Sequence, residues 1–215
     1  MKTRDRILSM ARQLFNEEGV NQVSAKAIAA RLNISDGNLR YHFRTKEDII
    51  YGLYQALVEQ LNQQFDQYRQ RISLSGMFQA LHFTFTQFEQ YRFLLLNFTD
   101  IMRQYATIRN HYQQLYQARQ QQFLGAVKQL IGAGIFREEI SEQQYKHLMA
   151  HFNIVSDFWL AHAEILYRGQ GNQLTHFTHL TFSLVVPYLT EAGLREYDQL
   201  PNLPEDSHLA SIKRL

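Results

Sequence analysis

Nine residues near the N-terminus, SDGNLRYHF at positions 35–43, concentrate side chains that could bind a polyanion. Asn38 both donates and accepts hydrogen bonds, which suits a phosphate or an adenine edge. Arg40 can bind a phosphate, or a guanine base through two parallel hydrogen bonds. Tyr41 offers a hydroxyl and a ring, and His42 offers a donor that strengthens on protonation. Together these side chains favour contact with double-stranded DNA.

Three neighbouring residues extend the same chemistry. Gly37 has no Cβ, so its backbone can come close to a base or a phosphate. Lys46 adds positive charge at the start of the next predicted helix, where backbone N–H groups already favour an anion. Asp36 would repel phosphate, and two interpretations stay open: it accepts from a cytosine amine, or it only stabilises the helix N-terminus.

The pattern around these residues predicts the short helices that would position them. A helix at 3–18 ends at Gly19, a glycine suited to a left-handed C-cap. Ser24 and Ser35 are predicted N-caps of two short helices at 24–32 and 35–42, separated by a tight turn at Asn33-Ile34. Those are the dimensions of a helix-turn-helix, whose second helix enters the DNA major groove. Thr45 starts a capping box, which predicts a long helix at about 46–70.

Residues 7–57 resemble the DNA-binding domain of the TetR family of bacterial transcriptional regulators. The segment IAARLNISDGNLRYHFRTKE at 28–47 matches the family pattern without a gap at nine positions: Ile28, Ala29, Ser35, Gly37, Leu39, His42, Phe43, Lys46 and Glu47. Two departures stand out. Arg40 replaces the usual tyrosine and changes the reading surface, and Leu32-Asn33 replaces Ala-Gly in the turn, where Asn tolerates a left-handed conformation.

The resemblance implies roles at particular positions. Family DNA contacts fall on Ser24, Lys26, Gly37, Asn38, Tyr41, His42 and Lys46. It also implies a repressor more than an activator, and a helical domain after about residue 60 that dimerises and binds a small ligand. Charge placement agrees with a polyanion partner at the N-terminus: residues 1–50 carry nine Lys and Arg against six acids, and the remainder 13 against 14.

The predicted fold is all-α. It comprises a three-helix helix-turn-helix domain at 1–50, a helical effector-binding and dimerisation domain at 51–193, and a loosely packed tail at 194–215. All three prolines lie after residue 186, and helical periodicity dominates the chain before them. Further helices are expected at about 76–91, 93–105, 107–133, 141–168 and 174–192. Ser141 is the predicted cap of the fourth of these, and Pro187 is expected to bend the last.

The helices at about 141–168 and 174–192 are apolar on more than one side. A helix of that kind needs two partners, one in its own core and one elsewhere, so these two are predicted to pair with their copies in a homodimer. On the first helix, Ile154, Phe158, Ala161 and Ile165 form the second stripe. A dimer would place two recognition helices on successive major grooves, roughly 34 Å apart, and implies a palindromic operator.

Aromatic residues are dense in the middle of the chain. They could be ordinary core, or they could line a cavity for a small hydrophobic or aromatic effector. The candidate ligand-binding residues are Phe88, Phe98, Met102, Tyr105, Phe152, Trp159 and His162.

Composition argues against several other classes. There is no cysteine, so neither a disulfide nor a thiolate metal site is possible, and we expect a cytoplasmic, nucleoid-associated protein with no membrane segment. His147 and His151, and His176 and His179, have spacings that could ligate a metal, but such pairs arise often by chance. We expect no cofactor, no metal and no catalysis. The remaining alternative is a helical scaffold or partner-binding protein with a vestigial helix-turn-helix.

Overall fold

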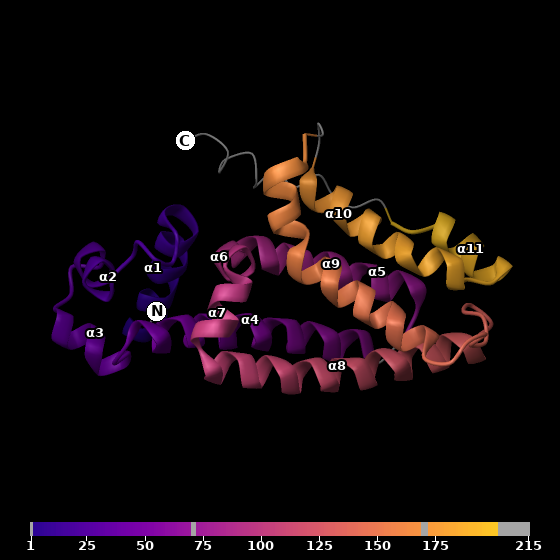
Figure 1. Cartoon of the computed structure of the whole chain (residues 1–215), viewed down its shortest axis with the longest axis horizontal. Helices are drawn as coiled ribbons and strands as arrows, with labels where there is room; N and C mark the ends of the chain where they lie inside the picture. The colour runs from indigo at the N-terminus through magenta and orange to yellow at the C-terminus, as the bar shows by residue number, and fades with distance from the viewer. Residues whose placement is uncertain (1, 70–71, 169–171, 202–215) are drawn as a thin grey trace. The chain divides into compact units, whose positions relative to one another are not determined.

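The computed structural model describes residues 2–69, 72–168 and 172–201 (Figure 1), and within them the chain is built from helices. The first half contains α1 (Thr3–Glu18), α2 (Ala25–Arg31), α3 (Asp36–His42), α4 (Lys46–Arg69), α5 (Leu74–Gln90), α6 (Arg92–Leu96) and α7 (Phe98–Gln104). The second half contains α8 (Ala106–Gly132), α9 (Gln144–Leu166), α10 (Gln173–Phe182), a 3₁₀ helix at Ser183–Tyr188 and α11 (Glu191–Asp198). The predicted all-α fold class is confirmed.

The chain divides into two compact units. Residues 1–63 and 90–115 form the first, and residues 64–89 and 116–215 form the second. The helix-turn-helix therefore belongs to the same unit as α6, α7 and the first part of α8. Helices α4, α5 and α8 each cross from one unit to the other.

Side-chain caps start the short helices of the first unit as the sequence predicts. Ser24 Oγ accepts from the amide of Ala27 at 3.1 Å, and Ser35 Oγ accepts from the amide of Asn38 at 3.1 Å. Each cap satisfies an amide that a helix start otherwise leaves without a partner. Thr45 and Asp48 form the reciprocal capping box, with bonds of 2.8 and 3.1 Å.

Two residues with positive φ turn the chain between these helices. Gly19 ends α1 at φ 86°, and Asn33 follows α2 at φ 53°. Glycine enters this region without a Cβ penalty, and Asn is among the few other residues that do so at modest cost. Asn33 has the positive φ that was expected, whereas the left-handed C-cap predicted at Gly19 is wrong, because its ψ of 149° is extended. Leu39 in α3 and Phe43 just after it, which follow these turns, are buried.

Asn16 joins α1 to the turn before α6. Its amide nitrogen donates to the carbonyl of Gln90 at 2.9 Å, and its amide oxygen accepts from the backbone of Phe93 at 3.1 Å. Beside it, the Phe15 and Phe93 rings pack at 5.2 Å, and Arg12 lies 5.0 Å over the Tyr91 ring. The Asn16 side chain thus satisfies one backbone acceptor and one backbone donor. These bonds attach the helix-turn-helix domain at residues 1–50, called the reading head below, to residues 90–93.

Stacked aromatic rings form much of the interior of the second unit. Trp159 on α9 lies against Phe85 on α5 at 4.9 Å and 15°, and against Phe177 on α10 at 5.3 Å. Phe136 stacks on Tyr145 at 5.9 Å and 9°. Offset-stacked rings add attraction beyond the area they bury, so these pairs hold α5, α9 and α10 together.

Three predicted helices differ from the structure. The helix expected at 93–105 is two helices, because Asn97 Nδ2 donates to the carbonyl of Phe93 at 2.8 Å and its backbone leaves helical geometry. Ser141 is not the cap of α9. Its carbonyl, not its hydroxyl, accepts from Gln144, and α9 begins only after Gln143, which is left-handed at φ 65°.

The helix expected at 174–192 ends early. Pro187 does more than bend it: α10 stops at Phe182 and the chain tightens into 3₁₀ geometry, which ends at Tyr188, since proline offers no N–H to an α-helix. Leu189 then pairs with Phe136 in an antiparallel bridge. Residues 194–198, expected to be loosely packed, are helical, and Tyr197 stacks on Phe182 at 6.1 Å and 4°. The rest of the expected tail, 202–215, lies outside the described residues.

Candidate nucleic-acid interface

Helix α3 presents the predicted reading residues on an open surface. Tyr41 is 86% exposed, more than any other large hydrophobic side chain among the described residues, and its ring meets His42 edge-on at 5.2 Å. Most of the predicted DNA-contact residues are exposed, namely Ser24, Lys26, Ser35, Asp36, Gly37, Asn38, Arg40 and Tyr41, whereas His42 and Lys46 are half-buried. One face of α3 is thus polar and open while Leu39 anchors the other.

Asp36 and Arg40 form an ion pair one helical turn apart. Arg40 Nε lies 2.8 Å from Asp36 Oδ2, and the two side chains are 69% and 47% exposed. The sequence left two interpretations of Asp36, and the structure shows a third contact that neither included. The Nε side of the Arg40 guanidinium is therefore occupied by Asp36.

Lys46 makes contacts inside the first unit. Its ammonium donates to the carbonyl of Val20 and lies 5.8 Å from the centre of the Phe15 ring. Partial burial lowers the pKa of Lys46. An ammonium carries three N–H groups, so the bond to Val20 leaves two for a phosphate. The lysine links the start of α4 to the loop after α1.

Family comparisons match both parts of the chain. Residues 7–51 match the family described as "Bacterial regulatory proteins, tetR family", and residues 54–197 match the one described as "Bacterial transcriptional repressor". The chain belongs to the TetR family of bacterial transcriptional regulators. The helix-turn-helix of α2 and α3 is accordingly the DNA-binding motif of a transcriptional regulator.

Individual relatives agree most clearly over the reading head. The HTH-type transcriptional regulator UidR of Escherichia coli K12 is 45% identical over 51 residues, which are 24% of this chain and 26% of UidR. The regulator SAUSA300_2515 of Staphylococcus aureus is 43% identical over 54 residues, 25% of this chain and 29% of that protein. The chain therefore matches only about a quarter of the length of these curated relatives.

Solved structures match nearly the whole chain. A TetR-family transcriptional regulator from Marinobacter aquaeolei VT8 has a TM-score of 0.80 and 28% identity, covering 94% of this chain and 100% of that one. A transcriptional regulator from Saccharomonospora viridis, solved in complex with choline, has a TM-score of 0.70 and 19% identity, with 87% and 97% covered. The second likeness concerns the fold alone.

The candidate ligand residues of this TetR-family chain fall in both units. Phe98, Met102 and Tyr105 belong to the first: Phe98 meets Tyr112 at 5.2 Å, and the Met102 carbonyl accepts from Arg109 at 3.1 Å. Tyr105 is buried, and this burial raises its pKa, with a further increase from Glu47.

The other four candidate residues lie in the second unit, where rings connect three of them. Trp159 and Phe88 both stack on Phe85, and His162 meets Phe177 edge-on at 5.9 Å. Phe152 packs against a different ring, Phe123, at 6.0 Å. Phe85 is one of the aromatic residues in the middle of the chain that were expected as core or cavity lining, whereas Phe177 was not among the candidate ligand residues.

The Trp159 indole is the most distinctive polar group of that cluster. The residue is only 2% exposed, and its Nε1–H is buried without a hydrogen-bond partner among the described residues. Such a donor loses its water without replacement, which costs about 1–3 kcal/mol.

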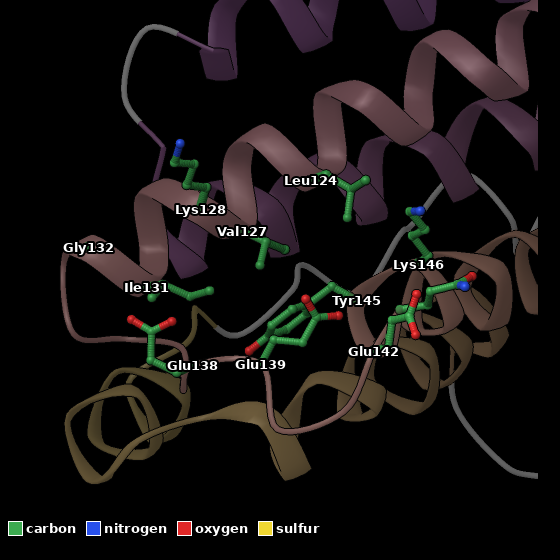
Figure 2. A pocket seen from close by; sticks show the side chains of 11 residues that line it. Leu124, Val127, Lys128, Ile131, Gly132, Glu138, Glu139, Glu142, Tyr145 and Lys146 are labelled. Atoms are coloured by element: carbon green, nitrogen blue, oxygen red, sulfur yellow. The ribbon is translucent and has the colours of Figure 1, made fainter.

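A separate hollow of about 620 Å³ lies where α8 meets the start of α9. Leu124, Val127 and Ile131 extend from α8 toward it, and Tyr145 lines the opposite side (Figure 2). Loop residues Glu138, Glu139 and Glu142 also line it, together with Lys128 and Lys146. None of the predicted ligand residues does.

Two further expectations concern metals and membranes. Across the described ranges, no group of three or more His, Cys, Asp or Glu is placed to hold a metal ion. Within the same ranges, no helix is both long and apolar enough to cross a membrane.

Helices α9 and α10 pack together and leave apolar side chains on their outer surface. On α9, Ile154 and Ile165 are 60% and 67% exposed, and Phe158 lies between them. Steps of four and seven residues place these three on one face of the helix. Leu180 on α10 is also exposed. This set, Ile154, Phe158, Ile165 and Leu180, is called the α9–α10 face below.

Proposed function

We propose that two copies of this chain bind a palindromic operator as a repressor and release it when a small apolar effector binds. The observation that carries the proposal is α3, a capped recognition helix in a TetR-family head whose polar face is open from Asn38 to Tyr41. An open helix of this size fits the major groove, where N-terminal side chains meet base edges.

The reading function is tested by selecting bound sequences from a random DNA pool with the full chain. We expect enrichment of a two-fold symmetric sequence, and affinity that falls steeply with salt while the preference remains. Tyr41→Ala should weaken binding without unfolding the protein, since the ring is exposed. A folded protein that enriches no sequence at low salt would contradict the proposal and favour the helical scaffold.

Repression is tested with a reporter gene whose promoter overlaps the enriched sequence. Occupied DNA blocks polymerase there, so co-expression of the chain should lower reporter output, and Tyr41→Ala should restore it. An increase in output caused by the wild-type chain would identify an activator instead.

The exposed apolar α9–α10 face supports the proposal that two copies of the chain form a dimer. Its members are exposed on helices whose other sides are already packed, and burying such a surface against its own copy removes apolar area from water. Sedimentation should show a dimer that dissociates more readily in Ile154→Asp and Ile165→Asp. Ile140→Asp, at an apolar side chain that is 84% exposed outside the face, is the matched control. A wild-type monomer at high concentration would rule the dimer out.

The aromatic cluster around Trp159 supports an apolar effector with a hydrogen-bond acceptor. Phe85 and Phe177 supply flat apolar walls, and the unpaired indole N–H supplies a donor that such a ligand would satisfy. An effector would act only through a difference in affinity between the operator-binding conformation and another one.

Trp159 is also the only tryptophan of the chain, so tryptophan fluorescence, excited selectively over that of tyrosine, reports on this cluster alone. A library of aromatic acids, ketones and hydrocarbons should shift the emission only for members that carry an acceptor. The same members should release the operator. A compound that releases the operator with no change in Trp159 emission would place the effector elsewhere.

A further inference from the structure

Arg40 is paired with Asp36 in the structure. The contact uses Nε of the guanidinium, at 2.8 Å from Asp36 Oδ2. Guanidinium has five N–H donors, and the four on the two terminal nitrogens stay available. Two of those four, one on each terminal nitrogen, form the end of the guanidinium that can meet guanine O6 and N7 as a pair. The ion pair therefore leaves free the edge that base reading needs.

The pair also sits at a favourable place on the recognition helix. Asp36 lies in the first turn of α3, just after the Ser35 cap, and Arg40 lies one turn further along. An acid four residues before a base is the favourable order on a helix, since both charges complement the helix dipole. The arrangement holds Arg40 along the axis of α3.

Asp36 has the opposite effect on contact with phosphate. A carboxylate at the protein–DNA surface repels the backbone of every sequence equally. An arginine without a partner gains sequence-independent affinity by turning to the nearest phosphate. A carboxylate that occupies Arg40 discourages that use, and specificity arises from a difference between the right and the wrong partner.

We propose that Asp36 is a specificity-determining residue, which positions Arg40 for a base edge and withholds it from phosphate. The proposal rests on the operator binding proposed above. It differs from a direct role of Asp36 on a cytosine amine, and from a surface ion pair that affects neither affinity nor readout.

The test compares the full chain with Asp36→Asn, Arg40→Ala and the double variant on the enriched operator. Each is measured against operators with single base changes and against random duplex DNA. We expect Asp36→Asn to bind random DNA several-fold more tightly and to lose about tenfold in discrimination at the base that Arg40 contacts. With Arg40→Ala in place, Asp36→Asn should no longer change that discrimination.

A matched control is Glu18→Gln, which removes the carboxylate of the Arg31–Glu18 surface pair, 3.6 Å long, in the same unit. It should alter neither discrimination nor the preference for random DNA. Thermal melts of each variant confirm folding, which is expected because both members of the Asp36–Arg40 pair are exposed.

The outcomes separate the two proposals. If the wild-type chain enriches an operator but Asp36→Asn reads it with undiminished discrimination, the positioning role is wrong and the operator binding stands. If discrimination falls by the same factor with and without Arg40, Asp36 reads a base itself and the positioning role is again wrong. If the folded wild-type chain enriches nothing, both proposals fall.

Discussion

Each compact unit contains both ring contacts and polar side-chain bonds to the backbone, as Phe15 with Phe93 in the first and Thr190 with the carbonyl of Gly134 in the second. Ring contacts are nevertheless more numerous among the described residues of the second unit. In the first, polar side chains bond to backbone groups of other segments, as Asn16 does to Gln90 and Phe93 and Lys46 does to Val20. In the second, ring stacking joins helices, as Trp159 does with Phe85 and Phe177.

The exposed surfaces differ in the same direction. The first unit exposes hydrogen-bonding groups on α3, and the second exposes the apolar α9–α10 face. A directional bond fixes the angle of a reading head, whereas ring packing allows helices to slide by small steps. We therefore expect the unit that contains the helix-turn-helix to be the more rigid of the two.

The largest effect is expected in the stacked interior of the second unit. Trp159→Ala should lower the free energy of unfolding by about 3–5 kcal/mol, because it leaves a cavity between Phe85 and Phe177. Trp159→Phe should cost less than half as much, since it keeps a ring there and removes an unpaired donor. Denaturant unfolding measures both. Equal losses for the two variants would show that stacking is not what stabilises this unit.

In the first unit, Asn16→Ala should have a smaller effect on stability and a larger one on geometry. Losing its two backbone hydrogen bonds should cost about 1–2 kcal/mol. Without these bonds the orientation of the reading head should be less fixed. When the half-sites of the operator are moved by one or two base pairs, the affinity of Asn16→Ala should therefore fall less than the affinity of the wild type. Gln13→Ala, on the same helix but bonded only to Glu17, is the control. If the affinity of Asn16→Ala depends on half-site spacing as that of the wild type does, the two hydrogen bonds of Asn16 do not orient the reading head.

Thr45→Ala removes the capping box at the start of α4. We expect a loss of about 1 kcal/mol, because the amide of Asp48 loses its acceptor while Asp48 can still accept from residue 45. Thr45→Ser keeps the hydroxyl and should lie close to wild type. Thermal unfolding compares the two, and a loss of the same size in Thr45→Ser would point to the methyl group instead.

The smallest expected effect is on the pH dependence of the stability of the second unit. Burial lowers the pKa of His179 from its ordinary value of 6.5, and its ring lies 5.0 Å from Phe78. As the pH falls, this histidine is protonated at a higher pH in the unfolded chain than in the folded chain. The free energy of unfolding therefore decreases from about pH 6.5 down to the lowered pKa of the folded state. His179→Gln should lose less Tm than wild type between pH 7.5 and 5.5. Identical losses of Tm in His179→Gln and the wild type would contradict a role of His179 in this pH dependence.

The features that the sequence predicted well depend on neighbours within a few residues. Caps at Ser24, Ser35 and Thr45 and the turn at Asn33 were all readable, because the bonding groups lie within one turn of each other. The long helix predicted at about 46–70 is confirmed as α4, which buries apolar residues at helical spacing, namely Ile49, Ile50, Leu53, Leu57 and Leu61.

The features that escaped prediction depend on residues far apart in the chain. Asn16 bonds to residues more than 70 positions away, and no local pattern distinguishes it from an exposed polar residue on α1. The helix break at Asn97 and the late start of α9 reflect side-chain and turn bonds that compete with helical ones. The ion pair between Asp36 and Arg40 was readable from its spacing, yet Arg40 was interpreted only as a DNA contact, and Asp36 only as a DNA contact or a charge at the helix N-terminus.

Half-site spacing tests the central claim most directly. With the enriched operator in hand, affinity is measured for the intact palindrome, for a single half-site, and for a palindrome with five base pairs inserted at its centre, about half a helical turn. A dimer that presents two α3 helices to one face of DNA should bind the intact palindrome far more tightly than either altered duplex. Equal affinity for all three would show that the two heads do not read DNA together, and would contradict the account.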